Sequence, residues 1–413
     1  MAGRNVLISG AGIAGPTLAF WLHAAGFRPT LVELAPALRT GGYIIDFWGL
    51  GYEIAERMGI APDLDRIGYH VRELRIVGEA GARRAGFGVG VFRELTGGRY
   101  VSLSRSELSR LLVEKIESRA EIIFGDEVVG LEDRGAEVMV RFRQGAERRF
   151  DLVIGADGQH SAVRRLVFGA EAEFEKRLGY IVAAFEAPGY RPRDENVYVA
   201  HGAPGRQLAR FALRDDRTLI LFVAALDSPL LSPTLDRPAQ RALLRRLFAN
   251  DGWETTPILD ALDRAEDLYF DHVSQITMPR WSRGRTALVG DAAFCLSLMA
   301  GQGSAVAMTA AYVLAGELSR ANGQHEAAFR AYENLLRPWI ATKQQAAVRF
   351  ARTFAPRTRF GLALRTCVMK TFFIPGLARL ALGRGIRDTL KLPEYGLPAS
   401  LERAMNRPRP VVR

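Results

Sequence analysis

The N-terminal region combines a short apolar run, a glycine-rich turn and a helical pattern. Asn5 to Ser9 fits a buried strand, Pro16 to Ala25 fits a helix, and Thr30 to Glu33 fits the next strand. Because such crossovers are right-handed, the two strands are expected to be parallel. Residues 5–27 contain no Asp, Glu, Lys or Arg, so a signal peptide or membrane span is the competing interpretation. The glycines and the proline inside this run favour strand, turn and helix.

The hydrophobic spacing changes further along the chain. Helical periodicity appears at 106–118, whereas apolar runs recur at short intervals from 178 to 225. The second pattern predicts a mainly antiparallel sheet, separate from the parallel one. A strand at 286–289 leads into a helical stretch from Gly303 to Arg337. We expect Pro338 to interrupt this stretch, with helix resuming to about Phe354.

Composition narrows the class of protein. A chain of 413 residues with 48% hydrophobic and 24% charged residues is typical of a folded globular protein. The net charge of +11 (56 Lys and Arg, 45 Asp and Glu) is concentrated between Arg349 and Lys391, where ten basic residues and one acid give +9. The rest of the chain carries a net charge of only +2. Because the positive charge is confined to one stretch, we predict no nucleic-acid partner. Cys295 and Cys367 form no disulfide framework or zinc-type spacing, so we expect a cytoplasmic protein without a metal site.

The first motif is Gly10-Ala11-Gly12-Ile13-Ala14-Gly15, between the first predicted strand and helix. Gly10 permits a tight turn, Gly12 lets the backbone approach a pyrophosphate, and Gly15 lets the helix pack close to the strand. The helix N-terminus offers free N–H groups to phosphates. Glu33 follows 18 residues after Gly15, at the end of the next strand, where it can bind ribose hydroxyls. These contexts predict a dinucleotide site but do not separate FAD from NAD.

Two further stretches favour FAD. One is DLVIGADG at 151–158, followed by Ser161 and Arg164, and the other is GRTALVGDAA at 284–293, followed by GQG at 301–303. With the three motifs in this order and separation, the sequence resembles the class A flavoprotein monooxygenases. That group includes para-hydroxybenzoate hydroxylase and the tetracycline-inactivating monooxygenases. The resemblance covers roughly the first 345 residues.

The resemblance assigns roles around the flavin. Asp291 would hydrogen-bond the ribityl chain of FAD, with helix capping as its alternative role. Gly301, Gln302 and Gly303 would present N–H groups near the flavin pyrimidine edge. A helix N-terminus placed there stabilises the negative charge of reduced flavin.

Five more residues take roles from the same resemblance. Asp157 and Gly158 resemble a DG pair that is linked to both FAD and NAD(P)H sites. Arg105 resembles an arginine that reaches FAD from the start of its helix. By comparison with the tetracycline-inactivating group, Arg39 would contact NADPH and Asp46 would contact FAD. A solvated surface position is the alternative for Arg39.

Four positions depart from the family pattern. Phe294 replaces the usual His, Leu298 the usual Pro, and Ala305 and Ala310 the usual Asn and Asp. Because these positions lie near the reactive edge of the flavin in the family, the departures leave the substrate subclass open.

The expected fold is α/β, with a Rossmann-like FAD-binding domain, an inserted β-rich substrate domain and a C-terminal helical segment. The FAD-binding domain would comprise 1–70, 101–177 and 268–345, and the substrate domain 71–100 and 178–267. The C-terminal segment would be 346–413. Phe185, Tyr198, Phe211, Leu221 and Phe222 would either line the substrate pocket or form the sheet core.

The implied reaction is an oxygenation. NAD(P)H would reduce FAD, O2 would add at the flavin C4a, and the resulting hydroperoxide would transfer oxygen to an apolar, aromatic or polycyclic small molecule. The protein would position the reactants and exclude water. The sequence identifies no catalytic side chain and does not give the oligomeric state. Its histidines, His160 among them, look isolated, with structural or surface roles.

Three alternatives remain open. A flavin-dependent halogenase shares the fold, but its Trp-x-Trp-x-Ile-Pro signature is absent from the sequence. A membrane-associated flavin reductase of prenyl chains would explain the basic segment at 349–391 as a membrane-surface element. A helix that ties the two domains together is the interpretation we favour for that segment. The third alternative is an FAD-binding protein that no longer oxygenates.

Overall fold

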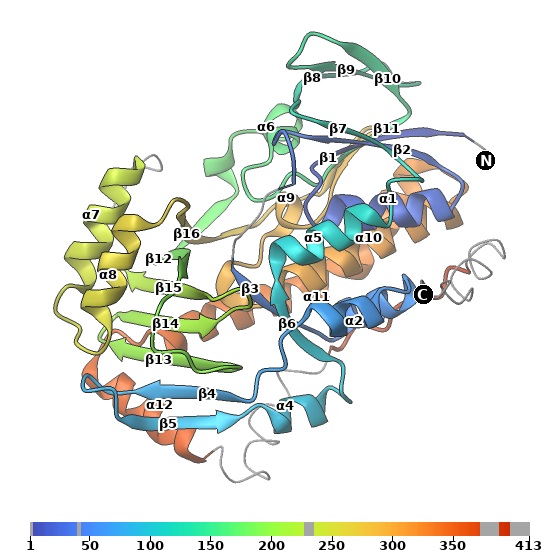
Figure 1. Cartoon of the computed structure of the whole chain (residues 1–413). Helices are drawn as coiled ribbons and strands as arrows, with labels where there is room; N and C mark the ends of the chain where they lie inside the picture. Colours follow the sequence, from blue (N-terminus) through green and yellow to red (C-terminus); the bar gives the residue numbers. More distant parts are fainter. Residues whose placement is uncertain (1–2, 39–42, 227–234, 372–387, 397–413) are drawn as a thin grey trace, which may run out of the picture.

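The computed structural model of the chain describes residues 3–38, 43–226, 235–371 and 388–396. Within these ranges, one half of the molecule is built on a mostly parallel sheet and the other on a mostly antiparallel sheet (Figure 1). A two-stranded ribbon and the C-terminal helices join the two halves. This arrangement confirms the expected α/β fold class.

A six-stranded sheet forms the centre of the first half. Its order is β17-β18-β11-β1-β2-β7, and every neighbouring pair is parallel except β17 with β18. The side chains of Val6, Leu7 and Ile8 in β1 are fully buried, because layers cover both faces of this sheet. The bounds are β1 Asn5–Ser9, β2 Arg28–Glu33, β7 Glu121–Phe124, β11 Leu152–Gly155, β17 Ser282–Arg283 and β18 Thr286–Leu288.

Helices cover one side of this sheet, and a small three-stranded sheet lies on the other (Figure 1). Helix α1 packs against α10, with the rings of Trp21 and Tyr312 4.8 Å apart. Helix α5 contacts α1. Helix α6 instead contacts β8 of the three-stranded sheet, as well as β11 and β18. The bounds are α1 Ala14–Ala24, α5 Arg105–Glu114, α6 Ala162–Val167, α10 Gly303–Arg320, β8 Val128–Asp133, β9 Val138–Phe142 and β10 Glu147–Phe150.

A seven-stranded sheet of order β16-β12-β15-β14-β13-β4-β5 forms the second half. All its pairs are antiparallel except β13 with β4. Helices α7 and α8 pack on one face through Leu244, Phe248 and Ile258. The bounds are β4 Glu73–Val77, β5 Arg83–Gly88, β12 Glu175–Pro188, β13 Val197–Ala203, β14 Arg206–Ala212, β15 Arg217–Ala225, β16 Tyr269–Ile276, α7 Arg237–Phe248 and α8 Thr255–Arg264.

An antiparallel ribbon of β3 and β6 lies between the two halves (Figure 1). It passes through the centre of the molecule, so side chains on β3 and β6 can meet both sheets. The bounds of the ribbon and of the short elements are β3 Ile44–Trp48, β6 Tyr100–Ser104, α2 Leu50–Arg57, α3 Ala61–Ile67, α4 Gly90–Leu95, η1 Glu171–Glu173, α9 Asp291–Phe294 and η2 Leu298–Ala300.

The long helical stretch after Gly303 breaks at a different place from the one expected. Helix α10 ends at Arg320, and Asn322 and Gly323 follow with φ of 51° and 72°. These left-handed residues turn the chain. Pro338, where we expected the break, instead lies inside the continuous α11 His325–Phe354. A proline removes one backbone hydrogen bond, and the buried neighbours Trp339 and Ile340 hold both halves of α11 against the core.

Strand pairing moves two of the proposed domain boundaries. Strand β16 and the start of β12 belong to the seven-stranded sheet, so the proposed boundaries at 268 and 177 shift to about 277 and 174. Helix α11 crosses the boundary proposed at 345 without interruption. The domain division as a whole stays a proposal.

The C-terminal part of the chain touches both halves. Helix α12 Arg359–Thr371 packs against β5 and β13, and Arg365 donates a 2.6 Å hydrogen bond to Oε1 of Gln207. Residues 388–396 then lie on α2 and α10, where Tyr395 donates to Glu317 at 2.7 Å and Arg57 pairs with Glu394 at 2.8 Å. These contacts support the domain-tying interpretation. None of the described helices has the length and apolar character that a bilayer crossing requires.

The C-terminal stretch 388–396 should be sensitive to a single methyl group on α10. A Cβ at Gly316 would lie 2.2 Å from the ring of Tyr395, so Gly316→Ala must displace that ring. We expect trypsin to cut after Lys391 several-fold faster in the folded variant, with a loss of stability of about 1–3 kcal/mol. Gly90→Ala is the control, because a Cβ there meets no described atom within 4 Å. Equal cleavage of Gly316→Ala and wild type would contradict this packing.

Candidate functional site

The first glycine turn connects β1 to α1, and each of its glycines meets a different constraint. A Cβ on Gly10, which has φ +106°, would lie 2.5 Å from the carbonyl oxygen of Ala156. A Cβ on Gly15 would lie 1.9 Å from the carbonyl oxygen of Gly10. By contrast, a Cβ on Gly12 would meet only Nη2 of Arg105 among the described atoms, at 3.6 Å. Gly10 and Gly15 therefore close the turn, and Gly12 leaves space in front of a guanidinium.

Helix α5 presents two side chains to this turn. Arg105 is its first residue, and Ser109, one helical turn later, donates to the carbonyl oxygens of Ala11 at 3.2 Å and Gly12 at 3.0 Å. The sequence motifs singled out Arg105 but missed Ser109. Its only sequence signal is the spacing of four residues from Arg105.

Glu33 supports the same turn from the end of β2. Its two carboxylate oxygens accept hydrogen bonds from the backbone N–H of Ala11 at 2.9 Å and of Ala35 at 3.0 Å. A carboxylate oxygen has a second lone pair, so each can accept a further hydrogen bond from a ribose hydroxyl. Arg39 lies outside the described residues.

Asp291 opens α9 after Gly290, which has φ +67°. Burial raises the pKa of Asp291, and the positive charge of Arg105 opposes that rise. Oδ1 of Asp291 is 3.9 Å from the position that a Cβ on Gly303 would take. Arg105 and Asp291 thus link the first glycine turn to the second, at 301–303.

The second glycine turn leads into α10. Gly301 has φ +62°, and a Cβ there would lie 3.9 Å from the ring of Trp48. The side chain of Gln302 is buried and accepts a 2.7 Å hydrogen bond from Lys343, which sequence motifs did not identify. Just before the turn, Ser297 has φ 90° and ψ 148°, a region normally open to glycine only. Such backbone strain is typical of functional sites, and no sequence motif pointed to Ser297.

Asp157 and Gly158 lie beside the first glycine turn, but the carboxylate of Asp157 accepts hydrogen bonds from residues that follow it closely in the sequence. It accepts hydrogen bonds from the hydroxyl of Ser161 and from the backbone N–H of Val163 at 3.1 Å, which caps α6. Burial raises the pKa of Asp157. Gly158 has φ +79°, so it serves the turn before α6. A cofactor contact of this pair stays a prediction.

Asp46 lies on the β3 ribbon and points to three hydroxyl groups. Its Oδ1 accepts hydrogen bonds from Tyr100 at 2.7 Å and from Ser102, with Tyr198 of the seven-stranded sheet at 3.5 Å. Burial raises the pKa of Asp46, and the three hydrogen bonds oppose the rise. The FAD contact that was expected of Asp46 stays a prediction. The hydrogen bonds of Asp46 join the ribbon to the seven-stranded sheet.

Aromatic side chains gather between the ribbon and the face of the seven-stranded sheet that lies opposite α7 and α8. The ring centroids of Tyr198 and Phe211 are 4.4 Å apart, and Trp48 and Phe92 are 5.1 Å apart. We call this group the aromatic layer. Its aromatic members are Tyr43, Trp48, Tyr69, Phe92, Tyr100, Tyr198, Phe211 and Tyr269, and Leu221 packs among them.

Two of the residues expected to share this face do not. Phe185 and Phe222 pack under α7 and α8, on the opposite face of the sheet. Side chains alternate along a strand, so Phe222 must point away from its neighbour Leu221, which lies in the aromatic layer. For Phe185 and Phe222, the sheet-core alternative is therefore the observed one.

His160 is not isolated, contrary to expectation. Nδ1 lies 2.8 Å from Glu171 and Nε2 lies 3.7 Å from Asp271 on β16. Asp271 and Glu171 raise the pKa of His160 to about 9. The loop before α6 is thereby tied electrostatically to the seven-stranded sheet.

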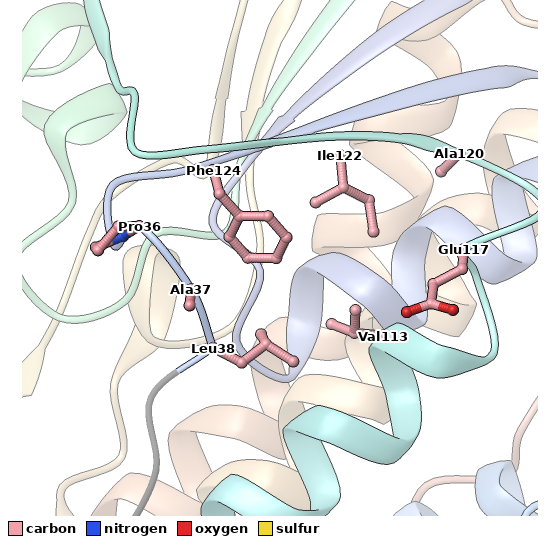
Figure 2. A pocket seen from close by; sticks show the side chains of 8 residues that line it. All are labelled: Pro36, Ala37, Leu38, Val113, Glu117, Ala120, Ile122 and Phe124. Atoms are coloured by element: carbon pink, nitrogen blue, oxygen red, sulfur yellow. The ribbon is translucent and has the colours of Figure 1, made fainter.

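Away from these residues, an open groove of about 580 Å³ lies along the outer edge of the parallel sheet (Figure 2). The loop after β2, helix α5 and strand β7 form its walls. It shares no residue with the predicted cofactor site. The lining residues are Pro36, Ala37, Leu38, Val113, Glu117, Ala120, Ile122 and Phe124.

Comparison with known proteins identifies the family. Residues 4–338 match the FAD binding domain family. An uncharacterized protein from Mycobacterium tuberculosis is 39% identical over 337 residues, which is 80% of this chain and 88% of that protein. A flavin-dependent monooxygenase from an unknown prokaryotic organism is 34% identical over 360 residues, with 85% and 90% covered.

The fold agrees with the sequence relatives. The crystal structure of the tetracycline destructase Tet(55) superposes with a TM-score of 0.82 at 31% identity, over 96% of this chain and 100% of that one. The two glycine turns, Glu33, Arg105 and Asp291 lie within the part of the chain that this superposition covers, and their contacts with FAD stay predictions. The chain therefore belongs to the FAD-binding domain family and, within it, to the class A FAD-dependent monooxygenases.

Proposed function

We propose that this enzyme uses NAD(P)H and O2 to hydroxylate, or otherwise oxygenate, an apolar aromatic or polycyclic small molecule in the cytoplasm. The observation that carries the proposal is the aromatic layer, which lies beside the residues assigned to FAD. Trp48 belongs to that layer and also flanks Gly301 of the second glycine turn. Bound FAD would supply the redox chemistry, with a C4a-hydroperoxide as the proposed oxygen donor.

The chain's own residues would bind and orient the cofactor. Space in front of Gly12 and the N-terminus of α1 would receive the pyrophosphate, with Arg105 adding positive charge. Glu33 would accept hydrogen bonds from ribose hydroxyls, and Asp291 from the ribityl chain. Ser109 would hold the carbonyl groups of the first turn away from the phosphates.

The substrate would lie against the aromatic layer. Rings stack on aromatic side chains at 4.5–7 Å between centroids, and such a surface also excludes water from the reacting groups. The name of Tet(55) indicates that one structural relative acts on tetracycline, a polycyclic compound. We therefore propose polycyclic phenols as the first compounds to test. Asp46 and Tyr198 would give this apolar surface its polar contacts.

The two alternative functions receive less support. A membrane-associated prenyl reductase would need the basic segment at a bilayer, but its described parts pack on β5, β13, α2 and α10. A non-oxygenating flavoprotein would bind FAD without consuming O2. Measurement of O2 uptake separates this last alternative from a monooxygenase.

We expect a turned-over substrate to accelerate reduction of the flavin. Early reduction wastes reductant as hydrogen peroxide, so delay until binding favours coupled turnover. Stopped-flow absorbance of the FAD-loaded protein with NADH or NADPH, across a panel of aromatic and polycyclic compounds, should show a faster phase with a true substrate. Product mass should increase by one oxygen, with one O2 consumed per product. Equal reduction rates with and without a turned-over compound would refute gating.

Gly12→Val should abolish FAD binding while the protein stays folded. A Cβ at this position has room, but the valine methyl groups would occupy the space in front of Arg105. Flavin absorbance of the purified variant should fall below about a tenth of an equivalent, since loss of pyrophosphate contacts costs several charge-assisted hydrogen bonds. Circular dichroism checks the fold, and Gly90→Val is the matched control. A full equivalent of FAD in Gly12→Val would refute the assignment of this turn.

Arg39→Ala should weaken the use of NAD(P)H without removing FAD. The proposal rests on the resemblance to enzymes in which the corresponding residue contacts NADPH. We expect KM for the nicotinamide cofactor to rise about tenfold or more, as for loss of a charged hydrogen bond, with flavin content unchanged. If the variant instead loses FAD and keeps its KM, Arg39 belongs to the FAD site.

A further inference from the structure

The second glycine turn is held by a side chain that no motif covers. Gln302 lies between Gly301 and the first residue of α10, and its side-chain Oε1 accepts a 2.7 Å hydrogen bond from Nζ of Lys343. Lys343 belongs to α11 and is 13% exposed. An ammonium group can only donate, so Lys343 determines which end of the Gln302 amide faces it.

The same ammonium group is paired with the C-terminal stretch. Nζ of Lys343 lies 2.7 Å from Oδ1 of Asp388, whose side chain is 9% exposed. Oδ2 of Asp388 accepts a 3.0 Å hydrogen bond from the backbone N–H of Leu50, at the start of α2. A Cβ on Gly49, which has φ +68°, would lie 2.4 Å from Oδ2, so this approach requires glycine. Four separate segments thus meet at one buried ion pair.

The surroundings of the pair are apolar and tightly packed. Nζ of Lys343 lies 5.6 Å from the ring centroid of Trp339, and Trp48 lies on the side of Gly301. Trp48, Gln302, Trp339 and Asp388 line one gap that is too small to hold a water molecule. In such surroundings, an unpaired charge raises the free energy of the folded protein. Removal of either partner therefore leaves the charge of the other one uncompensated.

We propose that Lys343 and Asp388 are positioning residues for the flavin and act through Gln302. Lys343 fixes the second glycine turn against the cofactor, and Asp388 balances the ammonium charge that lies behind that turn. The C-terminal stretch 388–396 is thereby coupled to the electronic state of the flavin. This inference rests on the proposed contact between residues 301–303 and the flavin pyrimidine edge.

The charge balance gives the two residues opposite electrostatic signatures. Reduction adds negative charge to the flavin, so a nearby unbalanced cation favours the reduced form and an unbalanced anion opposes it. Lys343→Met leaves Asp388 unbalanced and should lower the reduction potential. Asp388→Asn leaves Lys343 unbalanced, retains an acceptor for the N–H of Leu50, and should raise the potential. A purely structural role would move both potentials in the same direction or leave both unchanged.

The experiment uses the full-length, FAD-loaded protein. Reduction potentials are measured by equilibration with a reference dye, and FAD affinity by titration of the apoprotein with FAD. We expect Lys343→Met and Asp388→Asn to weaken FAD binding about tenfold, the effect of one charged hydrogen bond. Lys343→Arg should keep near-wild-type affinity and potential, because it can donate to both partners. Glu394→Gln is the matched control in the same C-terminal stretch, since Glu394 is 80% exposed and pairs with Arg57 instead.

Opposite shifts of the two potentials, with rescue by Lys343→Arg, would support the proposal. Reduction potentials equal to that of the wild type in both variants, or shifts of equal sign, would overturn the proposal. If the wild type still bound FAD, the proposed function would stand. Wild-type protein that binds no FAD would overturn the proposed cofactor site itself. If Lys343→Met does not fold, Asp388→Asn and Lys343→Arg decide the question, and an unchanged or lowered potential in Asp388→Asn counts against the proposal.

Discussion

The arrangement of the half that contains the parallel sheet depends on how closely α1 approaches the end of β1. The carbonyl oxygen of Gly10 occupies space that any side chain on Gly15 would need, and Gly10 itself is pressed against Ala156 at the end of β11. With the turn closed in this way, Glu33 reaches the N–H of Ala11 and Ser109 reaches the carbonyl groups. Each of these hydrogen bonds therefore depends on the position of the turn.

Local patterns in the sequence were sufficient to predict this region. The strand, turn, helix and strand at 5–33 depend on neighbours within the same segment, and β1, α1 and β2 have close to the expected bounds. The sequence also predicted that side chains alternate along β15. It did not predict which face of the sheet each residue would occupy. That choice depends on α7 and α8, which cover Phe222 and leave Leu221 facing the ribbon.

The contacts of charged side chains were harder to predict. The carboxylates of Asp46 and Asp157 were assigned to cofactors by resemblance, but most of their hydrogen bonds come from hydroxyl groups and backbone N–H groups nearby. Lys343 and Asp388 lie 45 residues apart, and each is separated from its other partner, Gln302 or Leu50, by more chain than any motif spans. Periodicity carries no information on such pairs, since they form only when the surrounding helices have packed.

The order of strands in the parallel sheet affects how the chain can fold while it is being synthesised. The second hydrogen-bonded neighbour of β1 is β11, which begins at Leu152. The second neighbour of β11 is β18, which begins at Thr286. During synthesis, β1 therefore emerges more than a hundred residues before its second neighbour, and the sheet is complete only after Leu288 has been made. Pairing over such separations is slow, and unpaired strand edges attract other chains. We therefore expect the incomplete parallel sheet to be prone to aggregation while the chain is being made.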